Sequence, residues 1–491
     1  MEHVHIKNRP LILASVMLAM FLAAIEATIV STAMPSIVAD LGGFRLYSWV
    51  FSAYLLTNAA TVLLFGRLAD IFGRKPIFLT GISFFLIGAI LSALAPSMEV
   101  LVAARLVQGV GAGALMPIAT TIVGDIYTKE ERAKIQGYLS SVWGISAVTG
   151  PLLGGFFVDV LSWPYVFWMN VPLGLLALAG IMIFFKEESS MEKRSVDVIG
   201  SVWVILAISS LIVLLVEGGN RIPLMSVGFI GLVILSLGSL MAFIKHEKSM
   251  KDPMLPLDLW SIRSIRFANI TSFITGMILI GVSSYLPAFV QGVMERSATV
   301  AGFTLTTMSI GWPIASTMAG RLILKIGYRP TSMLGGTSLI AGAVLFSLLS
   351  SEKGPWFAAS GSLLIGVGMG LTSTSFIVSI QNAVEWQSRG IATASNMFMR
   401  SIGSALGAAL LGGLLNNRVA SYLEQEGLSG EYDVNSTNQL LTEAGRSELG
   451  NQAKVALQEG LSSGLHNVYL GLIVLAVASF LFILQLPKKE D

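Results

Sequence analysis

The feature that most constrains the fold is a series of apolar runs, each long enough to cross a bilayer as a helix. A spanning helix needs about 20 consecutive, mostly apolar residues. Fourteen such runs, bounded by charges, prolines and glycines, cover residues 11–34, 46–66, 76–96, 98–124, 136–159, 163–185, 197–217, 224–244, 267–290, 299–320, 331–350, 356–381, 390–415 and 467–486. Helices satisfy their own backbone hydrogen bonds in lipid, so the pattern predicts an all-α polytopic membrane protein.

The composition excludes several other classes of protein. Hydrophobic residues make up 54% of the 491 residues and charged residues only 12%, against about 25% charged in a typical soluble protein. The absence of cysteine excludes disulfide scaffolds, thiolate metal sites and cysteine nucleophiles. The four histidines are predicted in or beside loops: His3, His5, His246 and His466. We therefore expect no metal and no cofactor.

The distribution of lysine and arginine predicts the orientation. If the N-terminus is inside, the cytoplasmic segments hold about 22 basic residues and the outer loops about 7, as the positive-inside rule requires. Fourteen spans place the two termini on the same side, so both are predicted to be cytoplasmic.

The two ends of the chain resemble each other. Gly66-Arg67-Leu68 reappears as Gly320-Arg321-Leu322, and Gly109–Gly113 reappears as Gly366–Gly370. The repeat predicts two six-helix bundles, at 1–186 and 267–491, with a linker and two inserted spans at 187–266. Parallel six-helix repeats are typical of transporters that bind substrate near the midplane. A channel or a membrane enzyme has less need of this symmetry.

One outer segment, residues 416–466, is long and acidic, with seven carboxylates against three basic residues. It is predicted to be a partly helical or hairpin loop. Two interpretations remain open, a solvated surface loop and a gate or lid that attracts cations. The chain shows no polar catalytic cluster, and its glycine-rich runs lie inside apolar spans where no phosphate-binding loop could form. We expect neither an enzyme nor an ATP-driven pump.

Five motifs carry a family resemblance. They are Ile25–Pro35, Gly66–Pro76, Arg105–Gly113, Gly150–Gly155 and Trp163–Gly174. Together they resemble the major facilitator superfamily, most closely its 14-span drug–proton antiporter branch, although Glu26 stands where many members have Asp. The resemblance covers nearly the whole chain. It implies export rather than import, and a bacterial plasma membrane as the location.

Glu26 is the most informative residue, because an unneutralised carboxylate well inside a span costs several kcal/mol. It must bind a proton or have a cationic partner, and either suits it to proton exchange; a purely structural carboxylate is the alternative. Arg105 is expected at a similar depth below the outer surface. We predict that Arg105 tunes the proton affinity of Glu26, directly or through Gln108, or else bonds backbone carbonyls only. The second repeat has Ser362 at the position of Arg105, so proton coupling is expected in the first half.

Two motifs are predicted to act in gating. By resemblance, Asp70 would latch the two halves together, with partners in its own loop, which contains Gly73 and Arg74, and near Arg389. The alternative is a generic cytoplasmic anchor.

Gly150 and Pro151 lie near the middle of the fifth span. Proline bends a helix and glycine permits close helix packing, and the combination is associated with antiporters by resemblance. Pro151 becomes Ala408 at the repeat position, so the bend is expected in one half only.

Arg400 lies near the midplane with no obvious acidic partner. It could bind an anionic substrate group, neutralise Glu26 or face carbonyls. Weaker candidates for a substrate cavity offer aromatic, thioether or amide surfaces: Asn58, Met116, Trp143, Tyr285, Trp312, Gln381, Asn396 and Phe398.

These observations predict a proton-coupled exporter of amphipathic, often cationic compounds by alternating access, including drugs and antibiotics. The alternative is a dedicated lipid or metabolite facilitator of the same fold. The expected partners are small molecules, protons and the lipid bilayer, with no nucleic acid. Two repeats in one chain predict a functional monomer.

Overall fold

The computed structural model describes residues 8–127, 129–187, 198–218, 222–223, 225–250, 257–385, 389–428 and 431–487. In these ranges the regular structure is helical, apart from an isolated bridge between Gly218 and Ile222. The first part contains α1 Arg9–Leu41, η1 Phe44–Leu46, α2 Tyr47–Phe72, α3 Arg74–Ala93, α4 Met98–Ile126, α5 Lys129–Phe156, η2 Phe157–Leu161, α6 Tyr165–Trp168 and α7 Asn170–Phe184.

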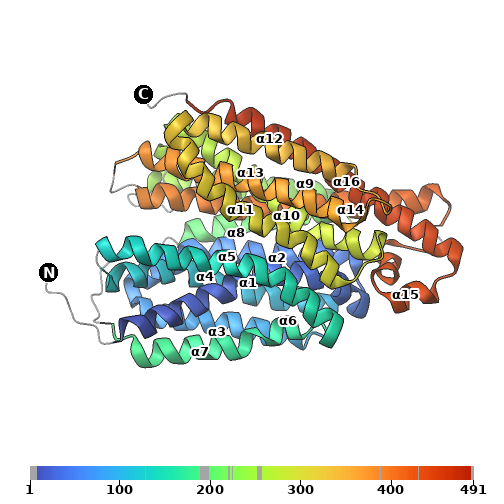
Figure 1. The fold of residues 1–491 in the computed structure, drawn as a ribbon, viewed down its shortest axis with the longest axis horizontal. Coiled ribbons are helices and arrows are strands. Elements are labelled where there is room, and N and C mark those ends of the chain that lie inside the picture. Colours follow the sequence, from blue (N-terminus) through green and yellow to red (C-terminus); the bar gives the residue numbers. More distant parts are fainter. Residues whose placement is uncertain are drawn as a thin grey trace.

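The rest of the chain continues in the same manner. It contains α8 Val198–Glu217, α9 Val227–Ser249, η3 Leu257–Ser261, α10 Arg263–Ala288, η4 Phe289–Val293, α11 Ala298–Ile326, α12 Tyr328–Ser347, α13 Gly354–Asn382, α14 Arg389–Gln425, η6 Val434–Leu441, α15 Glu443–Glu448 and α16 Asn451–Ile483. Helices α1–α7 form one bundle and α10–α16 a second beside it (Figure 1). We refer to them as the N-terminal and C-terminal bundles.

Helices α8 and α9 pack on each other, and α8 also packs on α2 and α14. The inserted pair therefore covers one edge of the seam between the bundles. On the other edge, α5 of the N-terminal bundle packs directly on α11 of the C-terminal bundle. Helix α2 also packs on α14 and α1 packs on α10, so three helices of each bundle take part in the contact between them.

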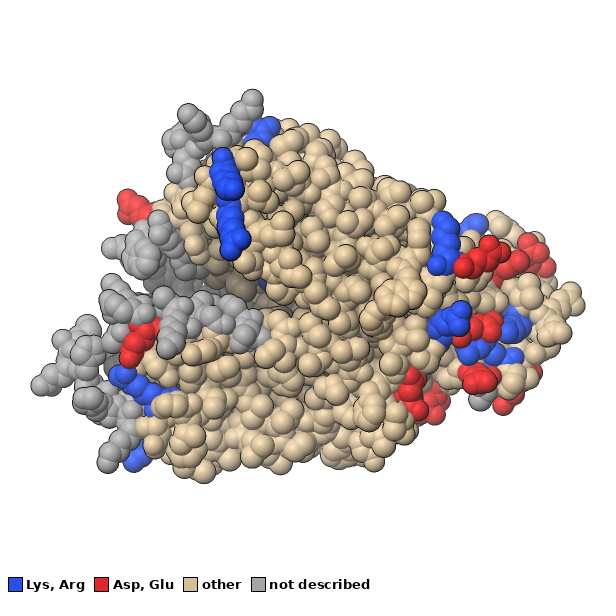
Figure 2. Space-filling view, in the orientation of Figure 1, with Lys and Arg blue, Asp and Glu red and all other residues tan. Residues whose placement is uncertain are grey.

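Helix α1 begins and α16 ends at the same end of the molecule, which we call the termini face. The segment η6–α15 lies at the opposite end, the cap face (Figure 1). Charged side chains gather toward these two ends, with a broad uncharged band between them (Figure 2). Apolar side chains in this band are largely exposed, for example Leu176 at 64%, Ile234 at 65% and Met241 at 68%. Such a surface suits lipid rather than water.

Thirteen helical segments in the described residues are long and apolar enough to cross a membrane. The expected span 299–320 is a helix, α11, but is not among the thirteen; it carries five threonines and two serines. Fourteen spans with cytoplasmic termini therefore stay a prediction. Two boundaries were wrong by ten residues or more: α14 ends at Gln425 rather than at 415, and α16 begins at Asn451 rather than at 467. The expected span 163–185 agrees with the span Tyr165–Phe184, which contains both α6 and α7.

A single glycine joins two helices at equivalent places in the bundles. Gly73 separates α2 from α3 with φ +95°, and Gly327 separates α11 from α12 with φ +85°. This backbone conformation is open to glycine and costly for other residues. The sequence repeat around Gly66–Pro76 and Gly320–Pro330 therefore corresponds to a repeated turn.

The glycine-rich runs fix the packing of α4 and α13. A Cβ at Gly109 would lie 2.1 Å from Thr57 Oγ1 of α2, whereas one at Gly111 would lie 2.2 Å from the Phe85 nitrogen of α3. In the second bundle, Gly370 similarly meets the Trp312 carbonyl oxygen of α11 at 2.4 Å, and Gly368 meets Leu339 of α12 at 2.6 Å. Alternate glycines thus hold each central helix between two neighbours, which is close packing that only glycine permits.

Candidate functional site

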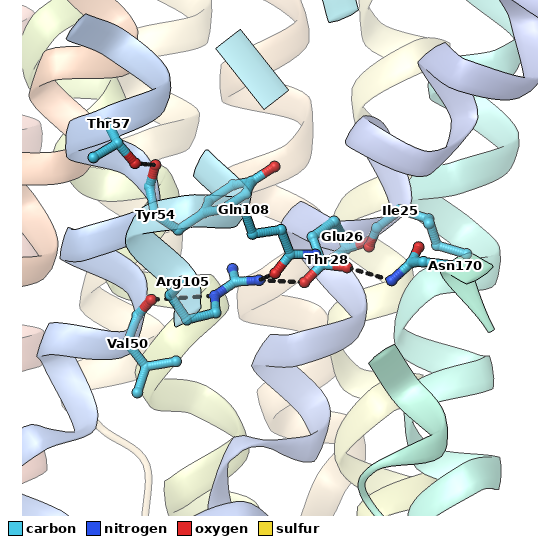
Figure 3. Close-up of polar contacts among 9 residues, drawn as sticks. All are labelled: Ile25, Glu26, Thr28, Val50, Tyr54, Thr57, Arg105, Gln108 and Asn170. Atoms are coloured by element: carbon cyan, nitrogen blue, oxygen red, sulfur yellow. Dashed lines mark hydrogen bonds and ion pairs between the residues drawn. The ribbon is translucent and has the colours of Figure 1, made fainter. Parts of the chain in front are cut away.

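Glu26 and Arg105 form an ion pair at the centre of the N-terminal bundle (Figure 3). Glu26 lies near the middle of α1 and its side chain is 0% exposed, while that of Arg105 on α4 is 1% exposed. The two residues expected at similar depth are therefore in direct contact. Burying either charge alone would cost several kcal/mol, so each side chain depends on the other.

Arg105 is fixed by three further contacts. Its Nη1 donates to Gln108 Oε1 at 2.6 Å, and its Nε donates to the Val50 carbonyl oxygen at 3.4 Å. Its guanidinium carbon stands 4.2 Å from the centre of the Tyr54 ring, within the range of a cation–π contact. The arginine is thus held to α2 as well as to α1, and its orientation toward Glu26 is preorganised.

Asn170 completes the surroundings of the carboxylate. Its Nδ2 donates to Glu26 Oε2 at 2.8 Å from the first residue of α7 (Figure 3). Two buried amide atoms beside the pair have no hydrogen-bond partner in the described part of the chain. Asn170 Oδ1 accepts no hydrogen bond, and Gln108 Nε2 donates none. Two amide groups beside the ion pair therefore retain unused hydrogen-bonding capacity.

The Gly150–Gly155 motif allows α5 and α11 to pack closely against each other. A Cβ at Gly302 of α11 would lie 2.2 Å from the Pro151 carbonyl oxygen, and one at Gly155 would lie 2.6 Å from Thr299 Cα. On its other side, Gly150 meets Thr28 Oγ1 of α1 at 2.0 Å. The motif thus packs α5 between α1 and the opposite bundle.

Asp159 joins the two bundles beside this seam. It follows α5 in the short π-helix η2, and its Oδ2 accepts from the Thr299 nitrogen at 2.9 Å while its Oδ1 accepts from the Ala298 nitrogen at 3.3 Å. These are the first residues of α11, so a carboxylate of one bundle caps a helix of the other, an arrangement that satisfies free N–H groups and favours the helix dipole.

Further contacts between the bundles lie toward the cap face. Tyr47 Oη donates to the Ser284 carbonyl oxygen, and its ring stacks on Tyr285 with centroids 5.8 Å apart. Gln291 Nε2 donates to the Thr32 carbonyl oxygen at 3.1 Å. Toward the termini face the helices of the two bundles diverge (Figure 1). In this conformation the bundles are joined at the cap face.

Residues 433–448, which we call the cap segment, lie over these contacts. Val434, Leu440 and Leu441 are buried. Asn435 Oδ1 accepts from the Arg45 nitrogen at 3.3 Å, and Arg446 Nη1 donates to the Gln291 carbonyl oxygen at 3.3 Å. The segment therefore touches both bundles, and its role as a lid or as a solvated loop stays a prediction. A cavity of about 720 Å³ opens beside it, lined in part by Asp40, Asp159, Glu295 and Arg446.

The predicted cytoplasmic latch is only partly described. The Arg74 and Lys75 nitrogens donate to Glu187 at 2.7 and 2.8 Å, and Arg74 Nε lies 2.8 Å from Asp125 Oδ2. Arg74 thus binds within its own bundle. The side chains of Asp70 and Arg389 lie outside the described residues.

Arg400 of α14 is placed differently from Arg105. Its guanidinium stands 5.9 Å from the centre of the Trp312 ring of α11. Within the described residues, no hydrogen bond or ion pair reaches that guanidinium, and its side chain is partly exposed. Glu26 already has Arg105 as its partner, so Arg400 does not neutralise it in this conformation.

Comparison with known proteins agrees with this architecture. The family model described as Major Facilitator Superfamily matches residues 16–408. The chain belongs to the major facilitator superfamily. Two relatives come from Bacillus subtilis (strain 168). "Multidrug transporter protein MdtP" is 34% identical over 85% of this chain and 77% of that protein. "Multidrug resistance protein 3" is 32% identical over 96% of this chain and 94% of that protein.

Solved structures show the same fold at low sequence identity. A bacterial homologue of the human lysosomal transporter Spinster, described as inward-facing and occupied, gives a TM-score of 0.67 at 16% identity, over 97% of this chain and 96% of that one. A D-xylose–proton symporter gives 0.65 at 13% identity, over 98% and 99% of the two chains. The protein is therefore a multi-pass transporter of small molecules, and not an enzyme.

The weaker cavity candidates of this superfamily member fall into two groups. Tyr285, Asn396 and Phe398 are buried in helix packing. Tyr285 donates to the Ala408 carbonyl oxygen at 2.7 Å, and Asn396 Nδ2 donates to Ser272 Oγ at 2.8 Å. The others keep some exposure: Asn58, Met116, Trp143, Trp312 and Gln381. For both groups a place in a substrate cavity stays a prediction.

Two residues of the site were missed from the sequence. Asn170 stands in the quoted Trp163–Gly174 motif, and an amide inside an apolar run was a usable signal for a partner of Glu26. Asp159 gave no such signal, because its partner Thr299 lies in the other bundle and far along the chain.

Proposed function

We propose that the protein is a proton-driven exporter of amphipathic compounds that works by alternating access. The single observation that carries the proposal is the buried Glu26 carboxylate, held by Arg105 of α4 and Asn170 of α7. A carboxylate at the middle of a spanning helix is a functional residue by default, and the relatives named as multidrug transporters support the substrate class.

The surroundings of Glu26 suit both protonation states. As an ion it accepts hydrogen bonds from Arg105 and Asn170. As an acid it would need an acceptor for its own proton, and Asn170 Oδ1 has no partner among the described residues. Rotation of the Asn170 amide would present that oxygen, because an amide carries both a donor and an acceptor. Protonation would meanwhile release Arg105 from its anion.

A release of Arg105 offers a route from proton binding to helix movement. Arg105 joins α4 to α1 through Glu26 and to α2 through Val50, and α2 and α1 carry Tyr47 and Thr32, which bond the opposite bundle. A change at Glu26 therefore acts on helices that form the closure at the cap face. A ligand shifts a two-state equilibrium only through a difference of this kind between the states.

We assign the termini face to the cytoplasm, so the described conformation is inward-facing. Substrate would enter from that side, and the contacts of Asp159 and Gly302 would separate for release at the cap face. A proton that moves inward across 100 mV contributes about 2.3 kcal/mol per cycle before any pH gradient. The bacterial plasma membrane is the proposed location.

Inverted membrane vesicles with an imposed pH gradient test this proposal. Ethidium is added while its uptake and the dissipation of the gradient are followed. We expect wild-type protein to take up dye and discharge the gradient, and Glu26→Gln to do neither at equal abundance. Glu352→Gln, which alters an exposed carboxylate in a loop, is the matched control.

A Glu26→Gln variant that matches the wild type would refute the assignment of Glu26. If wild-type vesicles ignored every amphipathic cation tested, the alternative of a dedicated lipid or metabolite facilitator would replace the exporter. Among the described residues, no specific contact favours that alternative.

A further inference from the structure

We propose that Arg400 and Trp312 form a binding site for the carboxylate of an aromatic, amphipathic substrate. The inference deepens the proposed function, on which it rests, by adding anionic and zwitterionic compounds to the expected cations. It stands on the position of the two side chains, on the lack of a protein partner for the guanidinium, and on the charge of the transport pathway.

Both residues lie level with the middle of the membrane band. Trp312 is midway along α11 Ala298–Ile326. The Arg400 carbonyl oxygen lies 2.2 Å from where a Cβ would stand on Gly276, which is midway along α10 Arg263–Ala288. The pair is therefore at the depth at which transporters of this architecture bind substrate.

The two residues also come from helices that contact the opposite bundle, because α14 packs on α2 and α11 packs on α5. The Arg400 side chain extends from α14 toward α11, and its guanidinium lies 5.9 Å from the centre of the Trp312 ring. A charged group at this depth is costly in contact with lipid and faces protein or water instead. The pair therefore joins two helices that border the seam between the bundles.

The main chains that carry both side chains are held by close glycine contacts. Gly276 lets α10 approach the Arg400 carbonyl, and Gly370 lets α13 approach the Trp312 carbonyl, at 2.2 and 2.4 Å from the respective ideal Cβ positions. Ser404 Oγ also donates to the carbonyl oxygens of Gly276 and Arg400, both at 3.1 Å. These contacts fix the backbone from which the Arg400 and Trp312 side chains extend.

The local charge favours an anion. Three charged side chains lie inside the helices α1, α4 and α14: Glu26, Arg105 and Arg400. Glu26 and Arg105 neutralise each other and are 0% and 1% exposed, which leaves the positive charge of Arg400 without a counterion. A guanidinium can bind a carboxylate through two parallel hydrogen bonds, and Trp312 offers a flat apolar face for an aromatic ring.

Binding measurements on the purified full-length protein in lipid nanodiscs test the inference. The probes are 1-pyrenebutyrate and its methyl ester, which share the aromatic body and differ in charge. Energy transfer from tryptophan reports binding, with empty nanodiscs subtracted. Arg400→Gln should weaken binding of the carboxylate about tenfold or more, as expected for loss of a charge-assisted hydrogen bond, with little change for the ester. Arg400→Lys should restore part of the difference.

Arg418→Gln is the matched control, because this arginine of α14 already donates to Ser463 Oγ at 2.9 Å near the cap face. Equal loss of both probes in Arg400→Gln would overturn the inference and leave Arg400 a structural role. No loss of either, or no binding of the carboxylate to the wild type, would also overturn it. Failure of the exporter proposal is seen separately, as absence of ethidium and pyrenebutyrate transport in wild-type vesicles.

Discussion

The two bundles treat a charge at the middle of the membrane in opposite ways. In the N-terminal bundle, Arg105 has an anion, an amide, a carbonyl and an aromatic ring around it, and 1% of its side chain is exposed. In the C-terminal bundle, Arg400 has one aromatic ring and no counterion among the described residues. The repeated scaffold is nevertheless similar in the two bundles, because the equivalent helices α4 and α13 both carry alternate glycines.

This difference suggests a division of labour on a repeated scaffold. The paired charges of the N-terminal bundle are buried away from substrate, so they suit a proton whose binding is coupled to substrate through helix movement rather than through direct contact. The free cation of the C-terminal bundle suits contact with substrate. The glycine packing is common to both halves because each needs close contact between spanning helices, whereas the polar chemistry is not repeated.

The largest expected effect comes from removing each arginine in turn. Arg105→Leu leaves the Glu26 carboxylate buried without a counterion, so we expect a loss of about 3–5 kcal/mol in the free energy of unfolding. Arg400→Leu removes a cation that has no ionic partner and should cost less than about 1 kcal/mol. Chemical unfolding in mild detergent measures both. The comparison between the bundles fails if the two variants lose similar stability.

The next largest effect is expected from a substitution in the seam between α5 and α11, where the two bundles must separate. Gly302→Val should force α11 away from the Pro151 carbonyl and reduce transport at least tenfold, since overpacking of a tight contact typically costs 1–3 kcal/mol. Gly144→Val of α5 is the control, because nothing lies within 4 Å of its Cβ position.

The native chain contains no cysteine, so one introduced cysteine can be labelled selectively. Its rate of labelling reports whether the two bundles separate at the cap face. Ser52→Cys, at a position that is 0% exposed, should be labelled from the cap face much faster in the Gly302→Val background. Unchanged labelling and transport would show that the Pro151–Gly302 contact does not hold the two bundles together.

A smaller effect is expected at the helix cap that joins the bundles. Asp159→Ala removes the acceptor for the first N–H groups of α11, a change that typically costs about 1 kcal/mol. Because the cap forms only when the bundles are closed at the cap face, its loss should favour the open state and raise the labelling of Ser52→Cys several-fold. Asp258→Ala, in a carboxylate outside the seam, should leave the labelling rate as it was.

The smallest effect concerns pH at the cap face. A hydrogen bond from Lys454 at 2.8 Å, with Arg446 nearby, holds the pKa of Glu295 below its usual value of 4.5. The stabilisation is therefore present above pH 4.5 and is lost as pH falls through the lowered pKa. For a partly exposed pair it amounts to at most about 1 kcal/mol. The free energy of unfolding should fall by this amount between pH 7 and pH 3, and Lys454→Gln should abolish this part of its pH dependence.

Much of the fold could be predicted because lipid imposes strong rules on sequence. Apolar runs and positive charges marked most helices to within a few residues, and the similar depths of Glu26 and Arg105 anticipated their contact. The early start of α16 at Asn451 could not be read, since the first turns of this helix precede the apolar run.

The contacts between the two bundles could not be predicted from the sequence, for a different reason. Asp159 and Thr299 lie in different repeats, and no local pattern links a carboxylate to a helix start so far along the chain. The ring of Tyr285 marked it as a weak candidate for a cavity, and nothing in the sequence indicated that it stacks on Tyr47 of the other bundle. Which aromatic residues pack and which remain accessible depends on tertiary contacts alone.

The most direct test of the account is proton release on substrate binding. Ethidium is added to purified protein in weakly buffered nanodiscs, and the pH change is followed for the wild type, Glu26→Gln and the control Glu352→Gln. The account predicts proton release from the wild type and the control, and none from Glu26→Gln although it still binds the dye. Release of the same number of protons by Glu26→Gln would contradict it, and the coupling site would then lie outside the Glu26–Arg105 pair.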